Sequence, residues 1–204
     1  MESKINVSLR VKPLSENEAV NEKNRMWVKI SDNSIMNKRT NEIFQYDKVF
    51  SDDMGTQEIF DSQIKDIVQA AMNGINQTVF AYGQTSSGKT HTMKGCPKAG
   101  KGQDASRDDM GIIPLSVMEI FRMCKQEGTK REGGGDQVME NGKAARQYSI
   151  SVSYLEIYNE CVNDLIEPAN KNLEVRESIS SGIYINRLAE KKVTSFEEVM
   201  SYMS

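Results

Sequence analysis

Eight consecutive residues, 83–90, have the types and the spacing of a loop that binds phosphate. Their sequence is Gly-Gln-Thr-Ser-Ser-Gly-Lys-Thr, which fits the pattern G-x-x-x-x-G-K-[ST]. A glycine-rich loop can bring several backbone N–H groups close to one anion, and the positive end of a following helix adds to the attraction. The segment therefore predicts a polyphosphate site.

Each position of this loop has an expected role at the phosphates. The ammonium group of Lys89 is expected to neutralise β- and γ-phosphate oxygens, and the hydroxyl of Thr90 to bind Mg²⁺. The other positions contribute mainly backbone N–H groups or permit the tight turn: Gly83, Gln84, Thr85, Ser86, Ser87 and Gly88. Substitution of Lys89 should therefore matter more than substitution of the residues between the two glycines.

The loop requires a strand before it and a helix after it. Residues 77–82 (Gln-Thr-Val-Phe-Ala-Tyr) are rich in β-branched and aromatic types, which is typical of a buried strand, and a helix is expected from about Gly88. Apolar spacing predicts further helices over 56–71 and 112–125, and residues 195–198 resemble a capping box that opens another helix. Further strands are predicted over 5–11, 44–50 and 148–158, and residues 173–176 and 182–188 predict a small hairpin or two short strands. Strands that alternate with helices indicate an α/β domain with a central sheet.

Composition narrows the classes of partner. The 204 residues are 38% hydrophobic and 27% charged, with a net charge of −3, which indicates a globular protein without a general attraction to polyanions. No apolar stretch reaches the length of a membrane span, so neither nucleic acid nor a membrane is expected as a partner.

The three cysteines lack metal-ligand spacing and suggest reduced thiols in the cytoplasm. Residues 127–146, rich in Gly, Lys and Glu, predict a flexible surface insertion.

The residues around the loop, from Phe80 to Met93, closely resemble the nucleotide loop of the kinesin motor family. Four further segments resemble motifs of that family and follow in the same order: 10–14, 44–50, 111–114, and 152–160 with 164–166. Residues 173–177 are weakly similar to the centromere-associated subgroup. The chain, 1–204, is thus identified as an N-terminal portion of a kinesin motor domain. This resemblance implies a P-loop NTPase fold with a central mixed sheet flanked by helices, incomplete at its C-terminal side.

The resemblance also implies a function. Kinesins are ATP-driven motors on microtubules, so the expected ligands are ATP and Mg²⁺, the expected partner is tubulin in microtubules, and the expected location is the cytoplasm and cytoskeleton. By position, Arg10, Pro13 and His91 would border the adenine. The family often places a stacking aromatic where this chain has Ile75, and a second arginine where it has Lys12, so apolar contact should hold the base.

Candidate microtubule contacts are the basic residues Lys171 and Arg176, which follow the 164–166 motif. The resemblance further implies that the segments positioning the attacking water and sensing the γ-phosphate, switch I and switch II, lie outside this sequence. The Asp-x-x-Gly runs at 52–55 and 108–111 follow no apolar strand and indicate acidic turns. No catalytic residue is therefore assigned, and unpaired strand edges are expected beside the loop.

Two other functions stay open. One is a non-catalytic fragment that binds nucleotide without hydrolysis, either with or without microtubule binding. The other is an unrelated P-loop kinase or GTPase, for which the sequence offers no base-specificity motif. Direction of movement, cargo and oligomeric state are not determined by these residues.

Overall fold

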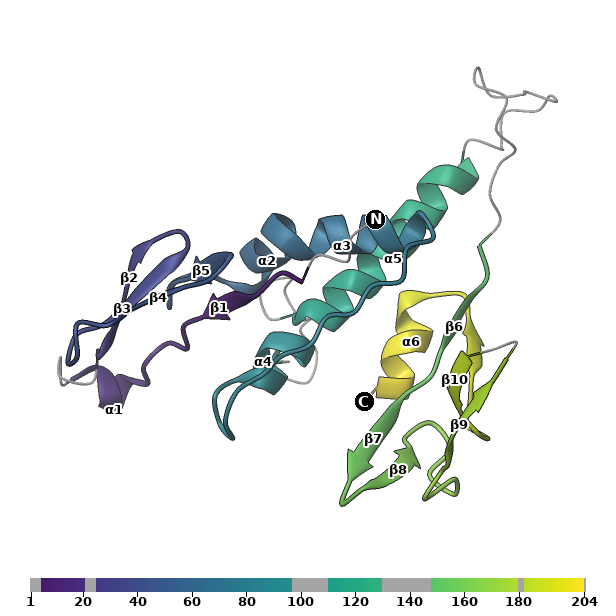
Figure 1. Ribbon diagram of the computed structural model, residues 1–204. Helices are drawn as coiled ribbons and strands as arrows, with labels where there is room; N and C mark the ends of the chain where they lie inside the picture. The colour runs from purple at the N-terminus through teal and green to yellow at the C-terminus, as the bar shows by residue number, and fades with distance from the viewer. Residues whose placement is uncertain (1–4, 21–24, 97–109, 130–147, 180–181, 204) are drawn as a thin grey trace. The chain divides into compact units, whose positions relative to one another are not determined.

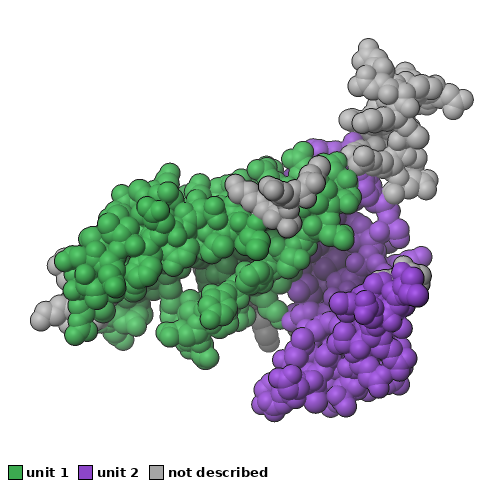
Figure 2. Space-filling model, in the orientation of Figure 1, with its two compact units in different colours: residues 1–115 green, residues 116–204 purple. Residues whose placement is uncertain are grey.

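The computed structural model describes residues 5–20, 25–96, 110–129, 148–179 and 182–203 (Figure 1). The chain divides into two compact units, residues 1–115 and residues 116–204 (Figure 2). The first unit contains the phosphate loop, and each unit is described separately. In the described ranges, no helix combines the length and apolar character needed to cross a membrane.

In the part of the first unit that the structure describes, the strands form two small sheets. They are β1 (Ser8–Arg10), β2 (Trp27–Ser31), β3 (Ser34–Asn37), β4 (Ile43–Gln45) and β5 (Lys48–Phe50), with the short helix α1 (Glu16–Ala19) after β1. Strands β2, β3 and β4 form an antiparallel sheet, and β1 pairs in parallel with β5. Val49 and Phe50 of β5 are fully buried, so the parallel pair contributes to the core.

The predicted strand 44–50 is two strands that pair with different partners. The backbone N–H of Tyr46 donates to the carbonyl oxygen of Asn33 (2.8 Å), and that of Asp47 donates to the carbonyl oxygen of Val7 (2.9 Å). The pairing therefore changes from β3 to β1 at residues 46–47. Alternation of apolar residues predicted the extended backbone correctly but carried no information on this change of partner.

The helices of the first unit follow the predicted apolar spacing. Besides α1, they are α2 (Thr56–Ile59), a π-helical turn η2 (Phe60–Ile64), α3 (Lys65–Met72) and α4 (Lys89–Lys94). The buried side chains of the first three lie at Thr56, Ile59, Phe60, Ile64 and Val68, which confirms the helix predicted over 56–71. Gly74, with φ of 89°, follows α3 and ends it in a left-handed conformation that favours glycine.

The segment before the phosphate loop is not the strand that its residue types predict. Residues 75–82 belong to no strand of this structure, and Phe80 and Tyr82 are 78% and 95% exposed. A strand needs a neighbour that accepts and donates its backbone hydrogen bonds, and among the described residues none pairs with this segment. The strand prediction is therefore wrong here, and residues 75–82 do not form one of the strand edges expected beside the loop.

The described residues of the second unit form one long helix, three antiparallel strand pairs and a short helix. Helix α5 (Ile112–Thr129) spans the division between the units, which confirms the predicted helix and includes residues 127–129 of the predicted insertion; residues 130–146 lie outside the described ranges. The strands are β6 (Ile150–Val152), β7 (Leu155–Tyr158), β8 (Cys161–Asp164), β9 (Val175–Ser178), β10 (Gly182–Ile185) and β11 (Lys191–Val193). The pairs are β6–β11, β7–β8 and β9–β10.

Two local predictions for this unit are confirmed and one is changed. The β9–β10 hairpin lies where residues 173–188 predicted it, and α6 (Phe196–Met203) begins after Ser195. The hydroxyl of Ser195 accepts a hydrogen bond from the N–H of Glu198 (3.2 Å), and the Glu198 carboxylate accepts one from the N–H of Thr194 (2.6 Å). The predicted single strand 148–158 is instead divided into β6 and β7.

Candidate phosphate-binding site

Both glycines of the phosphate loop lie where a side chain would be strained or crowded. Gly88 has φ of 98° and immediately precedes α4, a conformation that a residue with a Cβ rarely adopts. A Cβ on Gly83 would lie 2.5 Å from Oγ of Ser87. The N–H of Ser87 donates to the carbonyl oxygen of Gln84 (3.2 Å), and Ser86 between them has a left-handed φ of 65°. The backbone conformation thus favours glycine at position 88, and a side chain at position 83 would displace that of Ser87.

Lys89, the first residue of α4, extends back over the start of the loop. Its Nζ donates hydrogen bonds to the carbonyl oxygens of Gly83 (2.8 Å) and Gln84 (2.9 Å). The positive charge is therefore held at the loop itself. Because hydrogen bonds between charged partners are roughly twice as strong as neutral ones, a phosphate oxygen at this loop would compete well for the ammonium group.

The far end of α4 is fixed by a close approach of two backbones. A Cβ on Gly111 would lie 2.3 Å from the carbonyl oxygen of Met93 and 2.4 Å from the nitrogen of Gly95, and Gly95 forms an isolated antiparallel bridge with Met110. Only glycine fits at position 111 without a shift of the backbone. Sequence reasoning recognised Gly111 as part of a motif but missed this role.

Two cations at the end of β1 contact the loop and its helix. One guanidinium nitrogen, NH1 of Arg10, donates to the hydroxyls of Thr56 and Thr92, both at 3.0 Å. Nζ of Lys12 donates to the carbonyl oxygen of Ser86 at 3.0 Å. Burial lowers the pKa of Arg10 below its ordinary value. The chain end of β1 is therefore joined to both parts of the phosphate site.

The other expected nucleotide residues are accessible. Thr90 and His91 are exposed at the start of α4, and Pro13 is exposed three residues after β1 ends. Arg10 contacts α4 at Thr92, the residue next to His91. The adenine-side role of Arg10, Pro13 and His91 stays a prediction.

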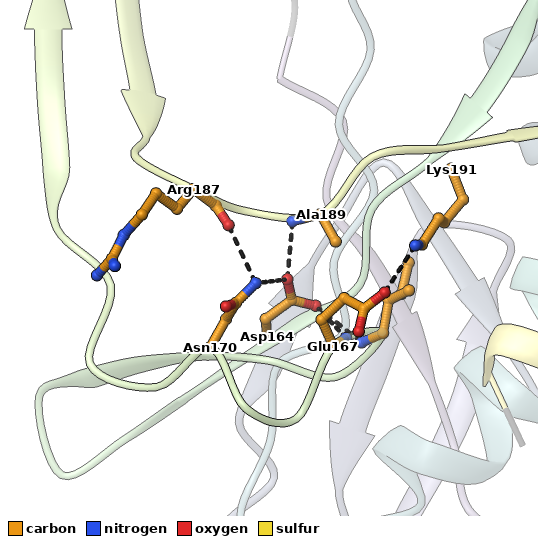
Figure 3. A network of polar contacts seen from close by, with 7 residues as sticks. Asp164, Glu167, Asn170, Arg187, Ala189 and Lys191 are labelled. Atoms are coloured by element: carbon orange, nitrogen blue, oxygen red, sulfur yellow. Dashed lines mark hydrogen bonds and ion pairs between the residues drawn. The ribbon is translucent and has the colours of Figure 1, made fainter.

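A separate polar network in the second unit is built around Asp164 (Figure 3). One carboxylate oxygen of Asp164 accepts hydrogen bonds from the N–H groups of Ile166 (2.8 Å) and Glu167 (3.0 Å). The other accepts from the N–H of Ala189 (2.7 Å) and from the side-chain amide of Asn170 (3.4 Å). Asp164 is 1% exposed, and every donor fixes part of the chain between residues 164 and 189.

This environment changes the acidity of Asp164. Burial by itself would raise the pKa of the carboxyl group, but hydrogen bonds from the backbone of Glu167, Ala189 and Ile166 and from Asn170 lower it below its ordinary value. The carboxylate therefore stays ionised. Its donors are fixed groups of the surrounding turns, which indicates a structural role.

The two candidate microtubule residues differ in their surroundings. Lys171 and Arg176 are both exposed. The guanidinium of Arg176 donates to the carboxylate of Glu174 from Nε (3.0 Å) and NH2 (2.6 Å), and this contact raises the pKa of Arg176. The charge of Arg176 is thus partly offset by its neighbour.

Comparison with known protein families gives a match over most of the chain. Residues 10–204 match the kinesin motor domain family. The chain belongs to the kinesin motor domain family. The resemblance predicted from five ordered motifs is therefore confirmed. The kinesin motor domain has the P-loop NTPase fold, so the predicted fold class is confirmed as well.

Kinesins from distant organisms are similar to this chain. It is 36% identical to the Kinesin-like protein KIN-7O of Arabidopsis thaliana and 35% identical to the Kinesin-related protein 4 of Dictyostelium discoideum, over 98% of its length in both cases. A solved structure described as "Structure of a fast kinesin: Implications for ATPase mechanism and interactions with microtubules" matches 98% of the chain with a TM-score of 0.78 and 32% identity.

The kinesin chain described here is shorter than these proteins. It spans 13% of the Arabidopsis protein, 9% of the Dictyostelium protein and 51% of the solved kinesin chain. The similarity of residues 173–177 to the centromere-associated subgroup stays a prediction.

Proposed function

We propose that this chain is the ATP-binding part of a microtubule motor, with the phosphate loop 83–90 holding the polyphosphate of Mg-ATP. The observation that carries the proposal is the loop itself. Gly88 in a left-handed conformation starts α4, and the ammonium group of Lys89 lies on the carbonyl oxygens of Gly83 and Gln84. Membership of the kinesin family supports the nucleotide class.

Mg²⁺ fits the donor set at the start of α4. Thr90 is exposed there and offers a hydroxyl oxygen, and Mg²⁺ prefers hard oxygen ligands that include substrate phosphates. The bound ion would neutralise charge between phosphate oxygens. The protein's own contribution is to hold Lys89 and Thr90 on adjacent positions of one helical turn, so that the ammonium group and the hydroxyl reach the same phosphates.

The base would lie against Arg10, Pro13 and His91. Exposure of Pro13 and His91 leaves both available for contact. Ile75, 43% exposed, supplies an apolar surface instead of an aromatic ring, so stacking would contribute less here than on Tyr or Phe. Weaker discrimination between adenine and other bases follows from this proposal.

Movement along microtubules is proposed for the whole protein that contains this chain. Support comes from the family and from the solved kinesin, whose description mentions an ATPase mechanism and interactions with microtubules. Within this chain we propose Lys171 and Arg176 as contacts to the acidic microtubule surface, and the cytoskeleton as the location. Opposite charge at such a surface accelerates association and is weakened by salt.

A second function, nucleotide binding without hydrolysis, is favoured by one observation. Two side chains of the acidic turn at residues 52–55 already have partners: Asp52 forms an ion pair with Arg25 at 3.2 Å, and Asp53 accepts a hydrogen bond from Ser51. These contacts support a structural role for the turn. Residues 108–109 of the other Asp-x-x-Gly run lie outside the described ranges.

Steady-state ATP hydrolysis with and without microtubules separates the two functions. The non-catalytic function predicts Mg-ADP binding without turnover by the 204-residue chain, and the motor function predicts ATP turnover that microtubules stimulate. Stimulated turnover by the 204-residue chain alone would exclude the non-catalytic function, and the absence of nucleotide binding would exclude both.

A further inference from the structure

A half-buried cation, Arg10, joins three elements of the first unit that are far apart in the sequence. It is the last residue of β1, and its NH1 nitrogen donates to the hydroxyl of Thr56, the first residue of α2, and to the hydroxyl of Thr92 in α4. The two contacts bridge 46 and 82 residues of sequence. Thr56 is 3% exposed, so one of the two acceptors is fixed in the core.

The partners of Arg10 are unusual for a desolvated cation. Burial disfavours an unpaired charge, and carboxylates commonly compensate it. In the parts of the chain that the structure describes, no ion pair of Arg10 with a carboxylate is found, and its side-chain acceptors are the two neutral hydroxyls. Arg10 therefore keeps a net positive charge beside α4, where a carboxylate would have cancelled it.

The contact with Thr92 acts on the helix that begins with Lys89 and Thr90. At its other end, α4 is held by the close approach of Gly111 to Met93. On the loop side, Lys12 donates to the carbonyl oxygen of Ser86. Arg10 contacts α4 between these two points, at the side chain of Thr92.

We infer that Arg10 is a positioning residue of the phosphate site, which holds α4 against β1 and α2 through the hydroxyls of Thr92 and Thr56. The inference rests on the proposed nucleotide function of the loop. It assigns Thr92 and Thr56 to nucleotide affinity although neither belongs to the loop pattern. Loss of the Thr92 hydroxyl should let α4 shift, and Lys89 and Thr90 with it.

The test compares two substitutions of one residue in the 204-residue chain. Thr92→Val removes the hydroxyl and keeps the shape, whereas Thr92→Ser keeps the hydroxyl. With fluorescent Mg-ADP as the probe, Thr92→Val should raise Kd about tenfold, the effect of losing one hydrogen bond to a charged group, and Thr92→Ser should stay within about twofold of wild type. Thermal unfolding of each variant shows whether it is folded at the assay temperature.

A second site keeps the inference testable if Thr92→Val unfolds. Thr56 reaches α4 through Arg10, so Thr56→Val should raise Kd about threefold, and Thr56→Ser should restore it. A purely structural role predicts lower melting temperatures with an unchanged Kd of the folded protein, and this result would overturn the inference. If wild type binds Mg-ADP and both valine variants bind it with the same Kd as wild type, the inference is overturned and the proposed function is not. A wild-type chain that binds no Mg-ADP would overturn the proposed function and the inference together.

Discussion

A carboxylate oxygen of Asp164 lies 2.7 Å from the backbone nitrogen of Ala189, which donates a hydrogen bond to it across 25 residues of sequence. Asn170 strengthens the same connection, because its side-chain amide donates to Asp164 and to the carbonyl oxygen of Arg187 (3.3 Å). The turn after β8 and the segment before β11 are therefore held together by one buried carboxylate (Figure 3).

Replacement of this carboxylate should destabilise the protein. Asp164→Asn places an amide NH₂ against fixed N–H donors, and the unsatisfied groups should lower the free energy of unfolding by about 2–4 kcal/mol. Urea unfolding measures the change. Glu177→Gln, an exposed position on β9, is the matched control and should have little effect. Equal stability of the two variants would contradict the structural role of Asp164.

The lowered pKa of Asp164 predicts a dependence of stability on pH. The unfolded carboxyl group titrates at about pH 3.9, above its folded pKa, so below that pH the unfolded state binds more protons. The contribution of Asp164 is thus fully present above about pH 5 and is lost as the pH falls through the folded pKa. Unfolding free energies measured from neutral to acidic pH should fall more steeply for wild type than for Asp164→Asn. Parallel curves would show that Asp164 does not contribute.

The exposed aromatic residues before the phosphate loop should promote self-association. Phe80 and Tyr82 are 78% and 95% exposed on a segment without a strand partner among the described residues, and such segments favour association between chains. Replacing both with serine should reduce association in sedimentation experiments and change the free energy of unfolding by less than about 0.5 kcal/mol. By contrast, Phe50→Ala, at a fully buried ring, should cost about 3–5 kcal/mol. If the double serine variant lost as much free energy of unfolding as Phe50→Ala, the rings of Phe80 and Tyr82 would have to lie in the core.

The two candidate microtubule residues should differ in effect. Because the charge of Arg176 is offset by Glu174, Lys171→Ala should weaken cosedimentation with microtubules by about twofold at low salt, more than Arg176→Ala. Glu174→Gln removes the carboxylate that offsets the charge of Arg176 and should strengthen binding to microtubules. Binding that is unchanged by all three substitutions would remove this part of the second unit from the proposed interface.

Local features of the site were predictable from the sequence. The spacing of two glycines, a lysine and a threonine predicted the loop, and Gly88 takes the left-handed conformation that starts α4. Apolar residues at helical spacing predicted the helix over 56–71. These features depend on neighbours within a few residues, and so a short window of sequence is enough to define them.

Contacts between distant segments were not predictable. The hydroxyl partners of Arg10 lie 46 and 82 residues away, and the glycine requirement at position 111 arises from the backbone of Met93. Residues 77–82 show the same limit. Their β-branched and aromatic types predict a strand, but a strand forms only where another strand is available to pair. Tertiary placement decides all three, and residue types alone do not specify it.

Titration of the chain with Mg-ATP, for wild type and for Lys89→Met, tests the central claim most directly. Lys65→Met, at an exposed lysine of α3, is the control. The proposed site predicts saturable binding by wild type and the control, and a Kd that is about 10- to 100-fold higher for Lys89→Met, the effect of losing a charged hydrogen bond of about 1.5–3 kcal/mol. Equal affinity of wild type and Lys89→Met, or no saturable binding by wild type, would contradict the assignment of residues 83–90 as the phosphate site.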